Sequence, residues 1–178
     1  MISICKLTHD QIKKLSKEMV ILIDTREKVN DHILNYFNKK NIAYRQQALE
    51  FGDYSFMLPK VVGLLCNELY FHKEIVIERK NSLEELSGNL GKGRERFEKE
   101  FLKARNNGCS IHLMVENPQG LNDIMKHNYN TQLKPTSYMA SLKSFEQRYD
   151  LKMQFIDPQY SGYNIYSTFY YYMRNKLH

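Results

Sequence analysis

The sequence predicts an α/β domain in which helices are layered against a largely covered central sheet. Two observations predict it. Short apolar runs rich in β-branched residues, such as Val20–Ile23 and Ile75–Ile77, alternate with segments whose apolar residues recur at helical spacing. Such alternation is typical of layered α/β folds. With 178 residues, of which 42% are hydrophobic and 26% charged, the chain has the size and composition of one soluble domain.

The individual elements follow along the chain. The pattern Thr8–Gln11 resembles a capping box and predicts a first helix, and Val20–Ile23 predicts a strand buried on both faces that ends at Asp24. Asn30 or Asp31 is expected to cap a second helix. Residues 59–73 show no clear pattern. Further strands are expected within 42–58 and at 75–77, 111–115 and 152–156, and further helices at 86–90, 97–101, 138–149 and 165–173, with a break at 91–93.

Charge and cysteine content narrow the function classes. Lys and Arg outnumber Asp and Glu by 26 to 20, and the resulting net charge of +6 favours a polyanionic partner such as nucleic acid. Three scattered cysteines, Cys5, Cys66 and Cys109, predict neither a disulfide framework nor a zinc site but reduced thiols in a cytoplasm. No run is apolar enough for a membrane span or a secretion signal, and no dinucleotide, P-loop or serine-hydrolase motif indicates a small-molecule cofactor or substrate.

The stretch EIVIERKNSLEEL, residues 74–86, places charges directly after an apolar strand. Side chains two residues apart on a strand share a face, so Glu78 and Lys80 point the same way and Arg79 points to the other face. Upstream, Gly52 and Asp53 offer a close backbone approach and a second carboxylate. If the two strands are neighbours, Asp53 and Glu78 can provide oxygen ligands for Mg²⁺, with Lys80 beside them to orient the nucleophile or neutralise a phosphate.

These motifs also resemble a known family. GDY at 52–54 followed by IVIERKNSLEEL resembles the G-D-X(n)-E-R-K-X3-D signature of XPF-type structure-specific endonucleases, a branch of the PD-(D/E)xK restriction-endonuclease-like nucleases. VILIDTRE, at 20–27, resembles the same family's strand ending in D-x-R-E, and residues 127–149 resemble the downstream part of compact bacterial and phage members. The resemblance implies a restriction-endonuclease-like fold, with a central mixed sheet flanked by helices on both faces.

The resemblance further implies an Mg²⁺- or Mn²⁺-dependent DNA endonuclease, selective for branched or flap DNA in repair, recombination or replication. Residues 1–178 would form a single nuclease domain, with an N-terminal helical extension at 1–18, a motif-bearing core at 19–116 and a C-terminal part at 117–178. Because dimers are common in the family, the tyrosine-rich C-terminal segment is expected to pack in the core or against a second copy. The alternative is a catalytically inactive DNA-binding or scaffold module that keeps the nuclease fold.

Carried over position by position, the resemblance implies a metal-binding cluster of Asp24, Asp53 and Glu78, with Lys80 catalytic. Other motif residues are expected to support the site or contact DNA. These are Arg26, Glu27 and Arg79, of which Glu27 has an open role because alternation places it off the face that Asp24 and Arg26 share.

Three further positions have two interpretations each. Glu84 stands where the family signature has Asp, yet Ser82 and Glu85 form a capping-box pattern in which Glu84 would only complement the first turn of a helix. Arg94 and Arg96 can contact phosphates or belong to a solvated helix face of alternating charge.

Overall fold

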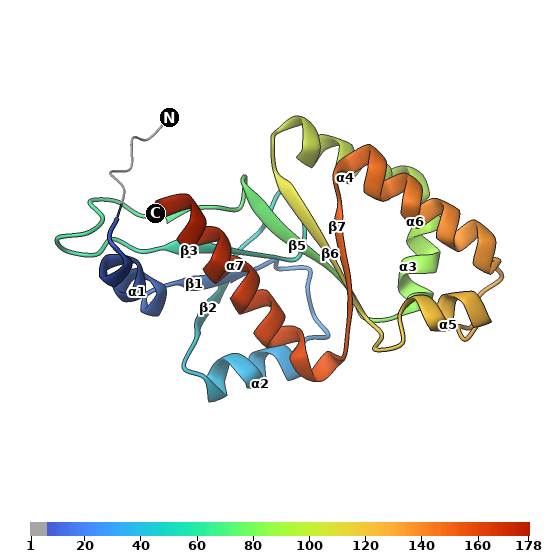
Figure 1. The fold of residues 1–178 in the computed structure, drawn as a ribbon, viewed down its shortest axis with the longest axis horizontal. Helices are drawn as coiled ribbons and strands as arrows, with labels where there is room; N and C mark the ends of the chain where they lie inside the picture. The colour runs from blue at the N-terminus through green and yellow to red at the C-terminus, as the bar shows by residue number, and fades with distance from the viewer. Residues whose placement is uncertain (1–6) are drawn as a thin grey trace.

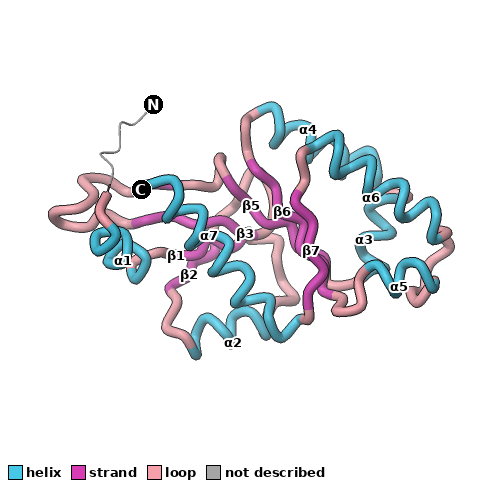
Figure 2. The backbone as a smooth tube through the Cα atoms, viewed as in Figure 1, coloured by secondary structure: helices cyan, strands magenta, loops and turns pink. Residues whose placement is uncertain are grey.

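The computed structural model describes residues 7–178, and within them seven strands form one mixed sheet (Figures 1 and 2). The strand order is β2-β1-β3-β5-β6-β7, with β4 paired to β3 at one end. The bounds are β1 Val20–Ile23, β2 Ala43–Gln46, β3 Tyr54–Leu58, β4 Leu69–Tyr70, β5 Ile75–Lys80, β6 Ser110–Glu116 and β7 Lys152–Ile156. Strand β3 runs antiparallel to β1 and β5. The pairs β1 with β2, β5 with β6, and β6 with β7 are parallel.

Helices cover both faces of this sheet, as predicted (Figure 1). One core joins the sheet to helices α1, α2 and α7, and a second core joins its other face to α3, α4 and α6. The bounds are α1 His9–Lys17, α2 Asp31–Lys39, α3 Leu83–Leu90, α4 Arg94–Asn106, α5 Leu121–Lys126, α6 Pro135–Tyr149 and α7 Ser161–Leu177, with a 3-10 turn at Pro158–Tyr160. Burial of these two apolar layers is the main stabilising term of the fold.

Local sequence signals account for several helix ends. The side chain of Thr8 accepts from the Gln11 amide and Gln11 reaches back to Thr8, which completes the predicted capping box of α1. Ser82 caps α3 by accepting from the Glu85 amide. The second helix begins where expected, but Asn30 makes no capping bond and instead donates to the Tyr54 hydroxyl. The expected break at 91–93 separates α3 from α4.

The N-terminal helix is an integral part of the fold. Its residues Ile12 and Leu15 are almost fully buried in the core that contains α7, and the Leu7 amide donates to the Leu177 carbonyl. The segment 59–73, which shows no sequence pattern, contains a bridge between Val61 and Leu65 followed by the two-residue strand β4. Strand β4 and helix α5 are additions to the predicted elements, too short for periodicity to reveal.

No helix within residues 7–178 is long and apolar enough to cross a membrane. Of the three cysteines, Cys66 is an exposed free thiol and Cys109 a buried one, whereas Cys5 lies outside the described residues. Burial raises the pKa of Cys109 to about 12, so this thiol is protonated and unreactive at neutral pH.

Candidate active site

The end of β5 separates its charges onto the two faces of the sheet. Val76 belongs to the core beneath α3 and α4, whereas Ile77 belongs to the core beneath α7. Glu78 and Lys80 continue on the Val76 side, and the Lys80 Nζ lies 2.7 Å from the Glu78 Oε1. Arg79 points to the other side. The alternation predicted from the sequence is confirmed.

Asp53 reaches this strand end through backbone pairing. Its amide donates to the Ile77 carbonyl at 2.9 Å, and its Oδ2 accepts from the Arg79 amide at 2.8 Å. The approach depends on Gly52, which has a φ of +60° and where a Cβ would lie 2.9 Å from the Val76 Cβ. A side chain at this position would collide with β5, and a positive φ is unfavourable for residues other than glycine. Both features therefore favour glycine here. Asp53 and Glu78 therefore lie on neighbouring segments, as the metal-site prediction requires.

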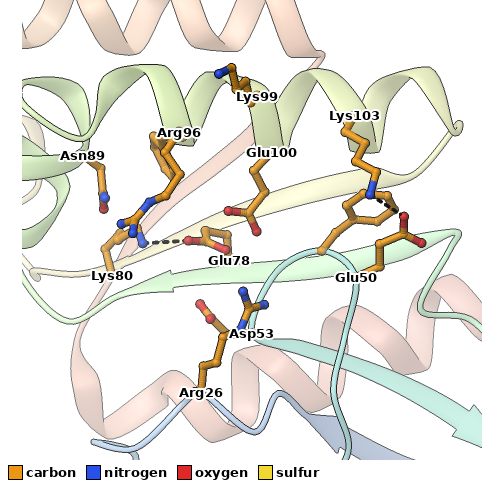
Figure 3. Close-up of a pocket in the computed structure, with 12 residues that line it drawn as sticks. Arg26, Glu50, Asp53, Glu78, Lys80, Asn89, Arg96, Lys99, Glu100 and Lys103 are labelled. Atoms are coloured by element: carbon orange, nitrogen blue, oxygen red, sulfur yellow. Dashed lines mark hydrogen bonds and ion pairs between the residues drawn. The ribbon is translucent and has the colours of Figure 1, made fainter.

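A cavity of about 470 Å³ opens over these groups, between the strand end and α4 (Figure 3). Its acidic lining comes from Glu50, Asp53, Glu78 and Glu100. Its basic lining is Arg26, Lys80, Arg96, Lys99 and Lys103. Figure 3 shows the carboxylate of Glu100 descending from α4 toward Glu78. The cavity thus joins strand-borne and helix-borne charges in one place.

Burial and mutual repulsion perturb the acids of the cavity. Burial, followed by the nearby Glu78 carboxylate, raises the pKa of Asp53 well above its ordinary value. Burial also raises the pKa of Glu78, against the opposing effect of Lys80, and the charge of Glu100 adds to the rise. Desolvation disfavours the Lys80 ammonium, but the Glu78 carboxylate outweighs it and raises the pKa of Lys80. The Lys80 ammonium therefore only partly compensates the Asp53 and Glu78 carboxylates.

Arg79 occupies a closed ionic network on the opposite face. Its guanidinium donates to both carboxylate oxygens of Glu116, at 2.9 and 2.7 Å, and to Glu27 at 2.7 Å. Glu116 also accepts from Ser161 and lies 2.7 Å from the His32 Nε2. Arg79 is 4% exposed, so of its two expected roles the structure supports stabilisation of the site. Glu27, whose role the sequence left open, accepts a hydrogen bond from Arg79 in this network.

Asp24 follows β1, and both of its carboxylate oxygens are hydrogen-bonded within the protein, although its amide donates to the Asp53 carbonyl at 2.8 Å. Its Oδ1 accepts from the amide and the Nε of Arg26, and its Oδ2 accepts from the Leu49 amide at 2.7 Å. Burial opposes ionisation, but these hydrogen bonds lower the pKa of Asp24. The carboxylate that follows β1 therefore holds the loop before Asp53, and the place of Asp24 in the expected metal cluster stays a prediction.

The remaining predicted residues divide between the cavity and other contacts. Glu84 is exposed and accepts from the Asn130 amide at 2.8 Å, which supports its helix-start interpretation and adds a loop contact. Arg94 donates to Glu98 and Ser141 and lies over the Phe145 ring, so it joins α4 to α6. Arg96 lines the cavity.

Two acids with clear roles in the structure were absent from the sequence-based prediction. Glu100 lies within a charged run on α4, and only the orientation of that helix brings it to the cavity. Glu116 follows the apolar run of β6, just as Glu78 follows the apolar run of β5. A charged residue directly after an apolar strand could therefore have pointed to Glu116 from the sequence.

The donor set of the cavity fits a hard divalent cation. Asp53 and Glu78 offer carboxylate oxygens from neighbouring segments, and their raised pKa values mean that a cation between them relieves an electrostatic cost. Within residues 7–178, no three or more Asp, Glu, His or Cys side chains are arranged to hold a metal ion. Two carboxylates with water completing the shell is nonetheless the usual protein contribution to Mg²⁺ binding.

Comparisons with known proteins agree with this fold. The chain is similar in structure to XPF from Aeropyrum pernix, with a TM-score of 0.62 and 18% sequence identity, covering 87% of this chain and 65% of that chain. A second structure, of XPF from Aeropyrum pernix in complex with DNA, matches with a TM-score of 0.61 and 17% identity, covering 88% of this chain and 66% of that one. The chain thus spans slightly less than two thirds of those chains.

At such identities the structural likeness shows the fold: a mixed α/β sheet with helices, matching the XPF nuclease domain. No curated protein matches the sequence. The model of the ERCC4 domain matches residues 23–167. This range includes Asp24, Asp53, Glu78 and Lys80. The chain therefore belongs to the ERCC4 domain family of XPF-type nuclease domains.

Proposed function

We propose that this protein is a metal-dependent DNA endonuclease that hydrolyses phosphodiester bonds in branched or flap DNA. The observation that carries the proposal is the convergence of Asp53, Glu78 and Lys80 in one charged cavity. A buried carboxylate and a partly buried one, both with raised pKa values, have little structural benefit beside an ammonium, because each costs desolvation energy. Membership of a family of typically metal-dependent endonucleases supports the same conclusion.

Asp53 and Glu78 would hold Mg²⁺ or Mn²⁺ in this cavity. When bound, such a cation lowers the pKa of water and stabilises negative charge on a phosphate under attack. The protein residues fix where this happens. The Arg79 amide and the pairing with Ile77 hold Asp53, and the ion pair with Lys80 holds Glu78.

Lys80 is expected to act as a hydrogen-bond donor. The Glu78 carboxylate raises its pKa, so the amine is protonated at neutral pH and cannot serve as a general base in this arrangement. An ammonium 2.7 Å from Glu78 can orient the attacking water or neutralise a phosphate oxygen. Removal of this donor is expected to slow the chemical step more than it weakens DNA binding.

The DNA backbone is expected to lie across the rim of the cavity. Lys99 and Lys103 already pair with Glu95 and Glu50, and Arg26 pairs with Asp24. Arg96 lines the cavity without an ion pair among the residues that the structure describes, so its guanidinium is available to a phosphate. Arg94 is committed to α6 and is not part of this proposed contact.

The test is a cleavage assay on single-stranded, duplex, flap and forked DNA with Mg²⁺ or Mn²⁺. Asp53→Asn and Lys80→Ala should each reduce the cleavage rate by about 10²–10³-fold, the usual loss on removing one group that stabilises transition-state charge. Lys143→Ala, an exposed residue on α6 paired with Glu146, is the matched control and should cleave normally. Undiminished cleavage by both site variants would refute the assignment. DNA binding without cleavage by the unmodified protein would instead support the inactive-module alternative.

The proposed homodimer is a separate question. The C-terminal helix α7 buries one face in the core and leaves Tyr163 and Tyr171 more than half exposed on the other, which offers an aromatic surface to a second copy. Light scattering over a range of protein concentrations tests this. A mass that stays at 21.2 kDa throughout would contradict the dimer.

A further inference from the structure

Glu100 differs from its neighbours on α4 in having no cationic partner among the described residues. Glu95 pairs with Lys99 at 2.8 Å, and Glu98 pairs with Arg94 at 3.0 Å. Glu100 instead accepts from the Gly52 amide at 3.3 Å and points into the cavity (Figure 3). A carboxylate turned toward other carboxylates is unfavourable unless positive charge joins it.

Apart from Arg96, the other charges at the rim of the cavity are paired. At the rim, Glu50 is paired with Lys103, and Arg26 with Asp24. What remains at the floor is three carboxylates, Asp53, Glu78 and Glu100, against the Lys80 ammonium. Once all are ionised, these four groups carry a net charge of −2, and the Arg96 guanidinium, which also lines the cavity and is unpaired among the described residues, offsets only one of the two.

Building on the proposed function, we infer that Glu100 is the third acidic group of the cation site, in the role that the sequence motif assigns to Asp24. It acts through water. No three acids within residues 7–178 are placed for direct ligation, and Mg²⁺ retains several waters in proteins. Glu100 accepts hydrogen bonds from the cation's hydration shell, while the Gly52 amide fixes its position.

This role makes Glu100 a positioning residue whose charge sets cation affinity. Groups that hold a metal site together from outside direct contact typically change affinity or activity by 10–100-fold when removed. The same glycine that lets Asp53 approach β5 also orients Glu100, since the Gly52 amide is its only hydrogen-bond donor within the described part of the chain. One residue of the loop therefore places two acids.

The test is Mn²⁺ binding, measured by titration calorimetry on the full chain without DNA. Glu100→Gln keeps an acceptor for the Gly52 amide and removes only the charge, and it should bind Mn²⁺ about tenfold more weakly. Glu98→Gln removes the same charge from the same helix on the side facing α6, and it should bind as the unmodified protein does.

Thermal unfolding without metal gives a second readout. Glu100→Gln should unfold at the same temperature or higher, because repulsion with Glu78 is relieved, whereas loss of a purely structural contact would lower it.

The outcomes separate the two proposals. If Glu100→Gln binds Mn²⁺ as tightly as Glu98→Gln, while Asp53→Asn loses binding, the role of Glu100 is refuted and the proposed function stands. If the unmodified protein binds no Mn²⁺, the proposed function fails and the role of Glu100 fails with it.

Discussion

The two faces of strand β5 use adjacent residues for opposite purposes. On one face, Arg79 is enclosed by Glu27 and Glu116, and every charge has a partner. On the other, Glu78 and Lys80 line an open cavity with Asp53, and burial together with neighbouring acids raises the pKa of Asp53 and of Glu78. A single tripeptide thus contributes to a structural ion-pair network on one face and to the candidate active site on the other.

The difference lies in how completely charge is compensated. For Glu116, burial opposes ionisation, but the bonds from Arg79 outweigh it and lower its pKa. For Asp53, burial and the neighbouring Glu78 act in the same direction and raise it. A buried carboxylate with a lowered pKa stabilises the folded state, and one with a raised pKa costs stability at neutral pH. The direction of the pKa shift therefore separates the ion-pair network from the cavity.

The largest expected effect comes from breaking the ion-pair network. Arg79→Met should lower the free energy of unfolding by about 3–5 kcal/mol, because it leaves Glu27 and Glu116 buried without their cation. Urea denaturation measures the loss. Lys80→Met, one residue away on the cavity face, is the comparison variant and should cost less, because it leaves one carboxylate, Glu78, without its cation and that carboxylate lines an open cavity. Equal losses from the two variants would remove the distinction between the faces.

The second largest effect is expected from a side chain at Gly52, which would disturb the approach of Asp53 to Glu78. Gly52→Ala should cost about 2 kcal/mol, because it combines a left-handed φ with a Cβ contact against Val76. Gly63→Ala has a φ of +78° but nothing within 4 Å, so it reports the backbone cost alone. Thermal or urea unfolding of both variants gives the difference. A Gly52→Ala loss no greater than that of Gly63→Ala would show that β5 tolerates the side chain.

Acidification should change the free energy of unfolding in opposite directions through the two faces, and each change should be smaller than the losses predicted above. The folded pKa of Glu116 is lowered, so its contribution is complete above the ordinary Glu pKa of about 4.3 and is lost as pH falls through the lowered value. The folded pKa of Asp53 is raised, so metal-free stability increases as pH falls from neutral through that raised value.

Unfolding free energies between pH 7 and pH 3 check this prediction. Asp53→Asn should reduce the gain on mild acidification, to which Glu78 with its raised pKa also contributes, and Glu116→Gln should reduce the loss at lower pH. A gain that persists unchanged in Asp53→Asn would mean that another group is responsible for it.

The smallest expected effect distinguishes two arginines on α4. Arg96→Ala should weaken DNA binding and reduce the slope of log affinity against log salt concentration by about one, the effect of one lost phosphate contact. Arg94→Ala should leave the slope unchanged, because Arg94 is bound to Glu98 and Ser141. Fluorescence anisotropy at several salt concentrations measures both. A changed slope for Arg94 alone would reverse the assignment.

Much of the fold could be predicted because its signals are local. The alternation in β5, the capping residue Ser82 and the break before Arg94 each depend on residues a few positions apart. The same holds for the division of Glu78 and Lys80 from Arg79, which follows from the two-residue period of a strand.

The site was less predictable because its partners are distant in sequence. Asp24 is bound by the Leu49 amide, 25 residues away, and Arg79 by Glu116, 37 residues away. The motif identified Asp24 as an acidic residue near a strand end. It did not reveal that both carboxylate oxygens accept hydrogen bonds from the protein. The approach of Glu100 depends on the angle of α4 over the sheet, which no periodicity encodes.

The hydroxyl of Ser161, at the start of α7, also binds Glu116, and α7 then fills the core against the central strands. A gene segment encoding only residues 19–116 would contain every motif position and still lack this closure. Grafted into another protein, it would expose the underside of its sheet and leave Glu116 short of a donor. The motif-bearing segment is therefore not expected to fold when moved alone into another protein. Transfer of this domain between genes has to include the C-terminal helix.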